Sequence, residues 1–256
     1  MKLLLALFDH LPGLSASAVV LPALCILAAT VGVFLVVTCL KVLFRSHLIG
    51  RGGERAVRRS LTRLGLAALH DVVLADRLGH TQIDHLVRTS RGIAVLETKT
   101  FVGWIKGTTY GAQWTQYLAG GRVRHAFQNP LRQNYRHCKA VEAAIGATAV
   151  PVAGFVVSAG RARFCFELAT AVVPVMDLGR IATSEFHADP VTADELEMAW
   201  ARLVACAAET PRLRCLHLAE VFAKRTPERV LEVRMAWGLL PVGVAAVLTG
   251  LAPLVR

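Results

Sequence analysis

Two carboxylates and a lysine flank a short turn in the segment from Gln82 to Lys99. Apolar residues crowd both halves of the segment, and the turn itself, residues 89–92, reads Thr-Ser-Arg-Gly. This pattern predicts a β-hairpin. If the turn is centred between its second and third residues, Asp84 lies opposite Glu97 with Cβ atoms roughly 5 Å apart, and Gln82 lies opposite Lys99.

The alternation of side chains along a strand predicts that these polar groups share one face. Glu97 and Lys99 then point to one side of the sheet and Thr98 to the other. Two carboxylates held this close repel each other, and the relief is either protonation of one of them or a bound cation. Oxygen ligands without His or Cys favour Mg²⁺ or Mn²⁺ over zinc, and Mg²⁺ leaves positions open for water and a substrate phosphate. An ammonium beside such an ion orients water and steadies developing charge, which is the chemistry of phosphodiester hydrolysis.

Several further short motifs follow one another along the chain. They are Gly50-Arg51-Gly52-Gly53-Glu54, Gln82-Ile83-Asp84-His85, Glu97-Thr98-Lys99, Gly103, Trp114 and Asn129-Pro130-Leu131-Arg132-Gln133-Asn134. In this order the chain resembles the nuclease-related domain known as NERD over residues 48–160. That family is similar to the restriction-endonuclease-like superfamily, whose signature is Asp, then Asp or Glu, one residue, then Lys. The resemblance implies an α/β fold with a mixed sheet flanked by helices.

The resemblance also assigns roles to individual residues. The two hairpin carboxylates would hold the metal, the carbonyl of Thr98 would add a ligand, and Lys99 would act on the attacking water. Glu54 matches an early acidic position and would join the metal shell directly or through water. Gln133 matches a polar position on a later helix and would contact metal-bound water or the substrate backbone. Because the family is named for its similarity to nucleases, a nucleic-acid-binding module of the same fold that does not cleave stays an alternative.

The apolar excess of the chain lies at its two ends. Mean hydropathy is +0.49, and the hydrophobic fraction of 54% exceeds that of ordinary soluble domains. After an N-terminal segment, 1–20, we expect a transmembrane helix over 21–43, because about 20 apolar residues cross a bilayer. The uncharged run 235–255 predicts a second one. A cleaved signal peptide is the alternative for the first run, and a docked amphipathic segment is the alternative for the second.

Basic residues flank the inner ends of both runs. They are Lys41, Arg45, Arg51, Arg55, Arg58 and Arg59 after the first run, and Lys224, Arg225, Arg229 and Arg234 before the second. The positive-inside tendency therefore predicts a multi-pass protein of the cell membrane, with the central domain in the cytoplasm and both termini outside. These flanks also predict contact with anionic lipid. The sequence does not identify a protein partner.

The net charge of +11 has a second source in the segment after the hairpin. Its basic residues are Lys106, Arg122, Arg124, Arg132, Arg136 and Lys139, and the aromatic residues among and beside them are Trp104, Tyr110, Trp114, Tyr117 and Tyr135. We expect nucleic acid to bind here, with Lys106, Arg132 and Arg136 on its phosphates. The alternative is a solvated basic face over aromatic core residues, and Trp114 in particular is expected in the core.

The remaining elements complete one α/β domain, with a nuclease-like part over 48–165 and further strands and helices over 166–230. We expect helices over 53–66, 131–145, 192–208 and 211–224, and strands over 71–74, 150–157, 164–168 and 171–175. The six cysteines contain no Cys-x-x-Cys pair, so neither a disulfide framework nor a zinc ribbon is indicated. His85, His125 and His137 are expected to be structural or surface residues. A membrane assembly protein that uses its acidic face only for stability is a third interpretation.

Overall fold

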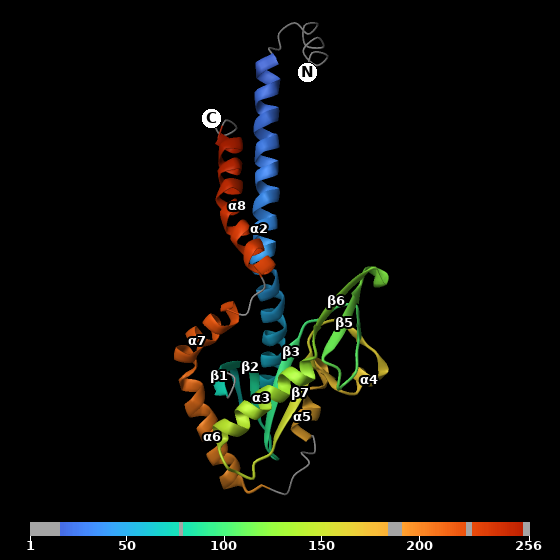
Figure 1. The fold of residues 1–256 in the computed structure, drawn as a ribbon, viewed down its shortest axis with the longest axis vertical. Helices are drawn as coiled ribbons and strands as arrows, with labels where there is room; N and C mark the ends of the chain where they lie inside the picture. The colour runs from blue at the N-terminus through green and yellow to red at the C-terminus, as the bar shows by residue number, and fades with distance from the viewer. Residues whose placement is uncertain (1–15, 77–78, 184–190, 224–226, 253–256) are drawn as a thin grey trace. The chain divides into compact units, whose positions relative to one another are not determined.

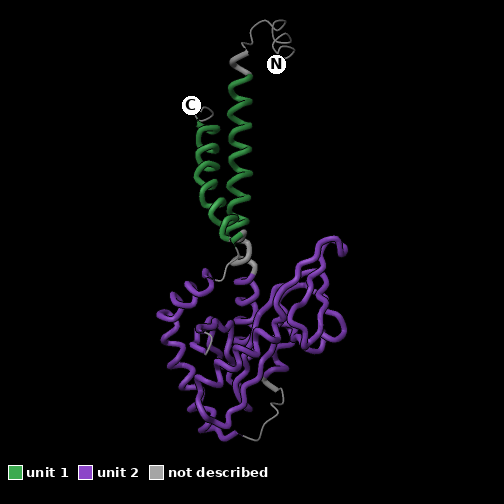
Figure 2. Tube along the Cα trace, in the orientation of Figure 1, with its two compact units in different colours: residues 1–47, 225–256 green, residues 48–224 purple. Residues whose placement is uncertain are grey.

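The computed structural model describes residues 16–76, 79–183, 191–223 and 227–252 (Figure 1). The chain divides into two compact units, one of residues 1–47 with 225–256 and the other of residues 48–224 (Figure 2). Helix α2 (Ala16–Arg63) contributes to both. Each unit is described by itself.

The first unit pairs the N-terminal part of α2 with α8 (Pro227–Leu251). By length and composition, the stretches Val20–Phe44 and Val230–Leu251 are able to span a membrane. Glycines bring the two helices together: a Cβ atom on Gly32 would lie 2.7 Å from the Gly243 carbonyl oxygen. A Cβ atom on Gly250 would likewise lie 2.7 Å from the backbone nitrogen of Ala29. Small residues at such positions allow close backbone packing, and the order of the contacts makes the pair antiparallel.

The second unit is built on a five-stranded mixed sheet with the order β1-β2-β3-β7-β9. Antiparallel pairing joins β1 to β2 and β2 to β3, whereas β3, β7 and β9 run parallel. The strands are β1 (Ala68–Asp76), β2 (Gly79–Arg88), β3 (Ile93–Lys99), β7 (Val152–Ser158) and β9 (Val172–Pro174).

Helices cover both faces of this sheet (Figure 1). On one face, Val57 and Leu61 of α2 pack with Leu96 of β3, and all three are fully buried. On the other face, helices α3 (Pro130–Ile145) and α6 (Ala193–Ala208) form a second core with the sheet. Successive residues of β3 therefore face the α2 layer and the α3–α6 layer in alternation.

A second, four-stranded sheet has the order β6-β5-β4-β8. Its strands are β4 (Trp104–Lys106), β5 (Gln113–Leu118), β6 (Val123–Gln128) and β8 (Arg163–Phe164). One face of it is a core surface, because Ile105 and Trp114 are fully buried there with Leu168. Trp114 is thus a core residue, as expected.

Most of the expected elements are confirmed, with two differences. Helix α2 begins at Ala16 and runs through the glycines at 50–53 instead of starting at 53. The strand expected over 164–168 is wrong beyond Phe164, because the chain turns there into α4 (Phe166–Ala169). The remaining helical elements are η1 (Ala119–Gly121), η2 (Val175–Asp177), α5 (Gly179–Thr183) and α7 (Thr210–Ala223).

Candidate functional site

The hairpin of β2 and β3 has the predicted register. His85 pairs with Leu96 and Arg88 with Ile93, and the paired ladder ends at His85. Asp84 and Glu97 come next, at the point where the regular backbone pairing stops. Here the Thr98 amide donates a hydrogen bond of 2.7 Å to Oδ2 of Asp84. The Asp84 side chain thus binds the second strand directly beside Glu97.

Glu97 and Lys99 face helix α3. Glu97 is 3% exposed, and Nζ of Lys99 lies 2.6 Å from its Oε1 atom. The same Nζ donates a hydrogen bond of 3.1 Å to Oε1 of Gln133 on α3. A carboxylate, an ammonium and an amide therefore form one connected group between the sheet and the helix.

Helix α3 is fixed over the sheet by Asn134. Its buried Nδ2 atom donates to the carbonyls of Val95 and Phe155, at 3.0 and 3.1 Å. These carbonyls belong to the neighbouring parallel strands β3 and β7. The helix starts at Pro130 after Asn129, whose side chain accepts a hydrogen bond from the Leu131 amide as an N-cap. Together these contacts set where Gln133 stands relative to Lys99.

His137 is a member of the site that the sequence interpretation missed. Its Nδ1 atom lies 3.4 Å from Oε2 of Glu97, and both side chains are 4% exposed. Burial lowers the pKa of His137 to about 4, so the ring is neutral near pH 7 and the contact is not an ion pair. The available signal was helical spacing, because His137 follows Gln133 by four residues and therefore lies on the same face of α3.

Glu54 reaches the site from the opposite layer, through a close approach of α2 to the sheet. Gly53 is buried, and a Cβ atom added there would collide with Cγ2 of Thr100 and lie 3.2 Å from Cβ of Ala159. The charge of Glu54 raises the pKa of both Asp84 and Glu97. The structure thus brings Glu54 within electrostatic reach of both hairpin carboxyls.

Burial dominates the protonation of the hairpin carboxyls. Burial, assisted by the Glu97 charge, raises the pKa of Asp84 to about 8, although the Thr98 amide opposes the shift. Burial also raises the pKa of Glu97, and the Lys99 ammonium opposes that rise. Without a further cation the pair therefore retains a proton at neutral pH.

A divalent cation would fit Asp84 and Glu97 as a site of two carboxylates, with water and substrate phosphate as the remaining ligands. The described residues hold no group of three or more His, Cys, Asp or Glu side chains placed to bind one ion. Asp84 and Glu97 are two carboxylates whose shared charge disfavours full ionisation, and Mg²⁺ is commonly held by one or two carboxylates with water and substrate phosphate completing the shell. The hydroxyl of Thr98 is buried without a hydrogen-bond partner. The methyl group of the same side chain lies next to Gly53 of α2, so the Thr98 side chain points away from Glu97 as the strand alternation predicts.

Gln82 does not pair with Lys99 as predicted, because the ladder between β2 and β3 stops at His85. The Gln82 amide instead donates a hydrogen bond of 2.7 Å to Oδ1 of Asp71, on the β1 side of the strand. Asp71 has a positive φ of 58°, which interrupts the regular pairing of β1 with β2. Gln133 is the amide that meets Lys99 instead.

The three predicted substrate contacts differ in their surroundings. Arg136 binds Asp76 with two hydrogen bonds, 2.6 Å from Nε and 3.1 Å from Nη2, so its charge is largely matched. Lys106 is exposed and Arg132 also lies at the surface of its helix. Lys106 holds its Nζ atom 5.5 Å from the ring centre of Tyr117.

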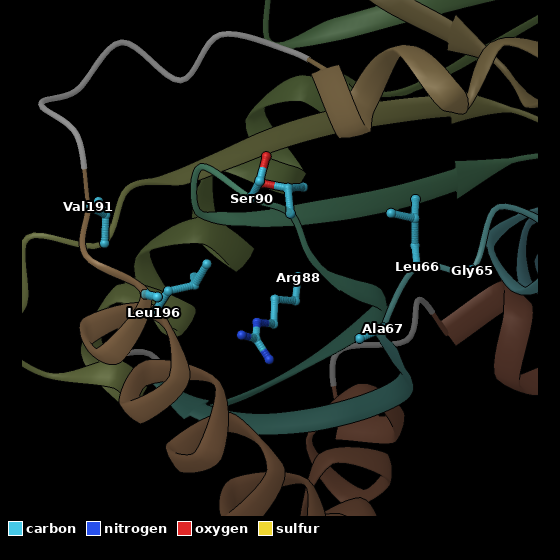
Figure 3. Close-up of a pocket in the computed structure, with 9 residues that line it drawn as sticks. Gly65, Leu66, Ala67, Arg88, Ser90, Val191 and Leu196 are labelled. Carbon is cyan, nitrogen blue, oxygen red and sulfur yellow. The ribbon is translucent and has the colours of Figure 1, made fainter.

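A pocket of about 490 Å³ lies elsewhere, at the turn of the β2–β3 hairpin (Figure 3). It is lined in part by Ser90, Leu196 and Arg88, whose guanidinium lies 2.6 Å from Glu197. Because the turn is at the far end of β3 from Glu97, this pocket is separate from the carboxylate site.

Comparisons with known proteins identify the family that this part of the chain matches. The model of the nuclease-related domain, NERD, matches residues 49–159, which confirms the resemblance predicted over 48–160. An uncharacterised protein of Bacillus anthracis is 43% identical over 97 residues, an alignment that covers 36% of this chain and 45% of that protein. The chain thus spans about half the length of this curated relative. No solved structure matches.

Proposed function

We propose that the chain is a membrane-anchored, metal-dependent nuclease that hydrolyses phosphodiester bonds, with its central domain in the cytoplasm. The observation that supports this most is the connected group of Glu97, Lys99 and Gln133, with Asp84 bound to the adjacent Thr98 amide, inside a nuclease-related domain. The two apolar helices and their basic flanks support the membrane anchor and its orientation.

The residues of the carboxylate site would have different roles in hydrolysis. Asp84 and Glu97 would hold Mg²⁺ or Mn²⁺, with the Thr98 carbonyl and Glu54 as further ligands, Glu54 directly or through water. When bound, the ion would polarise the phosphate and lower the pKa of water. Lys99, whose Nζ atom lies 2.6 Å from Glu97, would offer its ammonium to the attacking water and to the charge that develops on phosphorus.

The surrounding polar groups position these residues and the substrate. Gln133 holds the Lys99 ammonium in place through the 3.1 Å hydrogen bond. Arg132 and Lys106 lie at the surface and would bind the substrate backbone. Arg136 would do so only in exchange for part of its contact with Asp76.

Two variants test the proposal against purified wild-type protein, with Mg²⁺ or Mn²⁺ and with chelator. Glu97→Gln keeps the shape but removes a charge, so it should weaken metal binding measured by calorimetry and abolish cleavage. Lys99→Ala leaves both carboxylates, so it should still bind metal while cleavage falls by about 10²-fold or more.

The competing interpretation is a binding module of the same fold. The 2.6 Å contact of Lys99 with Glu97 favours it, because a carboxylate already satisfied by an ammonium needs no metal for its stability. A wild-type protein that never cleaves, and binds nucleic acid as well as both folded variants, would establish this alternative. Cleavage that both variants retain would place the active site elsewhere.

A further inference from the structure

The outer face of the four-stranded sheet carries an unusual set of side chains. Across the strands, Arg163 pairs with Trp104, Trp104 with Tyr117, and Tyr117 with Arg124. Cross-strand partners point to the same side of a sheet, so these four residues form one row. Lys106 follows Trp104 by two residues and lies on the same side. We call these five residues the aromatic–basic face.

This face is open. Trp104 is 48% exposed, Tyr117 is partly exposed, and the three basic residues are exposed. The opposite side of the same strands is the core side, where Ile105 and Trp114 are fully buried. The aromatic rings of the outer row are therefore not needed for the core.

Cations lie around the Tyr117 ring. Nζ of Lys106 is 5.5 Å and Cζ of Arg124 is 5.4 Å from the ring centre. No Asp or Glu occurs in the sequence between Glu97 and Glu142, so no acidic residue of these strands β4, β5 and β6 offsets the charge. The face thus offers flat rings with positive charge beside them.

We infer that the aromatic–basic face binds single-stranded nucleic acid by stacking unpaired bases on Trp104 and Tyr117, with Lys106, Arg124 and Arg163 on the phosphates. Exposed aromatic rings on a sheet stack bases that are free of their neighbours, and a duplex buries the faces of its bases. The inference rests on the proposed function, and it specifies the class of substrate.

The location of the face suits that role. Trp104 follows Lys99 by five residues, which limits their Cα separation to roughly 18 Å. The Arg163 amide donates to the Gly103 carbonyl and the Ala159 amide to that of Lys99, so the segments are also joined across the strands. The aromatic–basic face and the carboxylate site therefore lie close together within the same unit.

An anionic lipid surface is the rival partner, because Trp, Tyr and Lys also gather at membrane interfaces. The chemistry of the row argues for nucleic acid. The neighbouring positions on this side of β5 and β6, Thr115 and Ala126, are polar or small. The face therefore lacks the large aliphatic side chains that insert into a bilayer.

The test measures binding in chelator, so that cleavage is not required. Full-length protein in detergent is titrated against fluorescent oligo(dT) and against a duplex of equal length, by anisotropy. Trp104→Leu with Tyr117→Leu should weaken binding of the single strand about 10-fold or more and change duplex binding less than about threefold. Arg124→Gln should lower the slope of log affinity against log salt by about 0.7.

Phe166→Leu is the matched control, because Phe166 is 90% exposed but lies on α4 and not on the strands of the face; it should leave single-strand affinity unchanged. Equal losses for single strand and duplex, or unchanged binding in the face variants, would overturn the inference. The inference would also be overturned if the face variants lose binding to vesicles of anionic lipid but keep their affinity for the single strand. If the double variant does not fold, the exposed Arg124→Gln decides alone through its salt slope.

The outcomes separate this inference from the nuclease proposal. If wild type cleaves but the face variants bind the single strand as well as wild type does, the stacking inference is rejected and the nuclease proposal stands. Loss of single-strand binding in those variants, with no cleavage by wild type under any metal, retains the face and removes the enzyme.

Discussion

At the scale of single residues, the carboxyl pair of Asp84 and Glu97 keeps a proton near neutral pH, and a bound cation would displace it. Asp84 is half-buried beside the buried Glu97, and the charge of Glu54 acts on both carboxyls. Lys99 offsets part of that charge at 2.6 Å from Glu97. Binding of a divalent ion must therefore release a proton near neutral pH, and its affinity should rise with pH.

Asp84 also links stability to pH. The unfolded chain ionises this carboxyl near its ordinary value of 3.8, whereas the folded chain keeps the proton up to about pH 8. Unfolding between these limits releases a proton, so rising pH favours unfolding. In chelator, Asp84→Asn should thus raise the free energy of unfolding at pH 8 by more than about 1 kcal/mol, since each pKa unit corresponds to about 1.4 kcal/mol.

Thermal unfolding followed by circular dichroism at pH 5 and pH 8 checks this expectation. The amide introduced by Asp84→Asn keeps an acceptor for the Thr98 backbone N–H. The gain in stability should therefore be smaller at pH 5 than at pH 8, and it should vanish only below the unfolded pKa of 3.8. The exposed carboxyl of Asp177 provides the control, and Asp177→Asn should change neither midpoint by a comparable amount. Added Mn²⁺ should stabilise wild type more at pH 8 than at pH 6 and should stabilise Asp84→Asn little; an equal effect on both proteins would exclude Asp84 as a ligand.

The residues of the hairpin were predictable and their partners on other elements were not. A turn and a period of two suffice to set Asp84 against Glu97, because both effects are local. The contact of Glu97 with His137 depends on how α3 lies over the sheet, and that is fixed by Asn134 and two strand carbonyls distant in sequence. Gln82 failed as a prediction because the irregular backbone at Asp71 gave its amide a different acceptor.

At the scale of elements, α2 shows how packing keeps a segment helical although it contains residues of low helix propensity. Glycine costs roughly 1 kcal/mol in a helix interior, and 50–53 contains three of them. Val57 and Leu61 bury their side chains completely on the sheet, and this packing holds the helix next to those glycines. Sequence propensity predicted a break here because it does not include that packing.

Gly53 should tolerate no side chain, because it touches the end of β3. Gly53→Ala adds a methyl group against Thr100 and Ala159 and so should shift α2 and Glu54 with it. We expect a loss of about 1–3 kcal/mol in stability, typical of overpacking, and weaker metal binding. Gly52→Ala is the matched control, because that position is open and alanine favours the helix. Equal stability of the two variants in thermal unfolding would contradict the close approach.

The pair α2–α8 makes a similar prediction within the first unit. Gly32→Ala and Gly243→Ala each place a methyl group within 3.0 Å of the facing helix. Both should lower the thermal midpoint of the protein in mild detergent, whereas Gly238→Ala, with nothing within 4 Å, should not. A midpoint shift shared by all three variants would show that helix propensity, and not the glycine contact, controls this pair.

At the scale of the whole molecule, the distribution of charge serves two different surfaces. Part of the +11 net charge lies beside the apolar helices, where the proposed topology and contact with anionic lipid would account for it. Another part lies in the acid-free segment between Glu97 and Glu142, where Arg136 is matched by Asp76 but the aromatic–basic face is open. Composition alone predicted a basic protein; only the pairing of side chains separates the charges that are free to bind a partner.

The orientation proposed for the central domain rests on the basic flanks and is testable with a native thiol. Cys215 is exposed on α7, so a membrane-impermeant maleimide should label it only after cells are permeabilised. Cys215→Ser serves as the control, because it identifies how much of the labelling belongs to this thiol and not to the partly buried Cys165 and Cys206. Since a cytoplasmic nuclease would meet the cell's own nucleic acid, the result bears on function as well as topology. Labelling of Cys215 in intact cells would place the domain outside and would leave the basic flanks without their topological explanation.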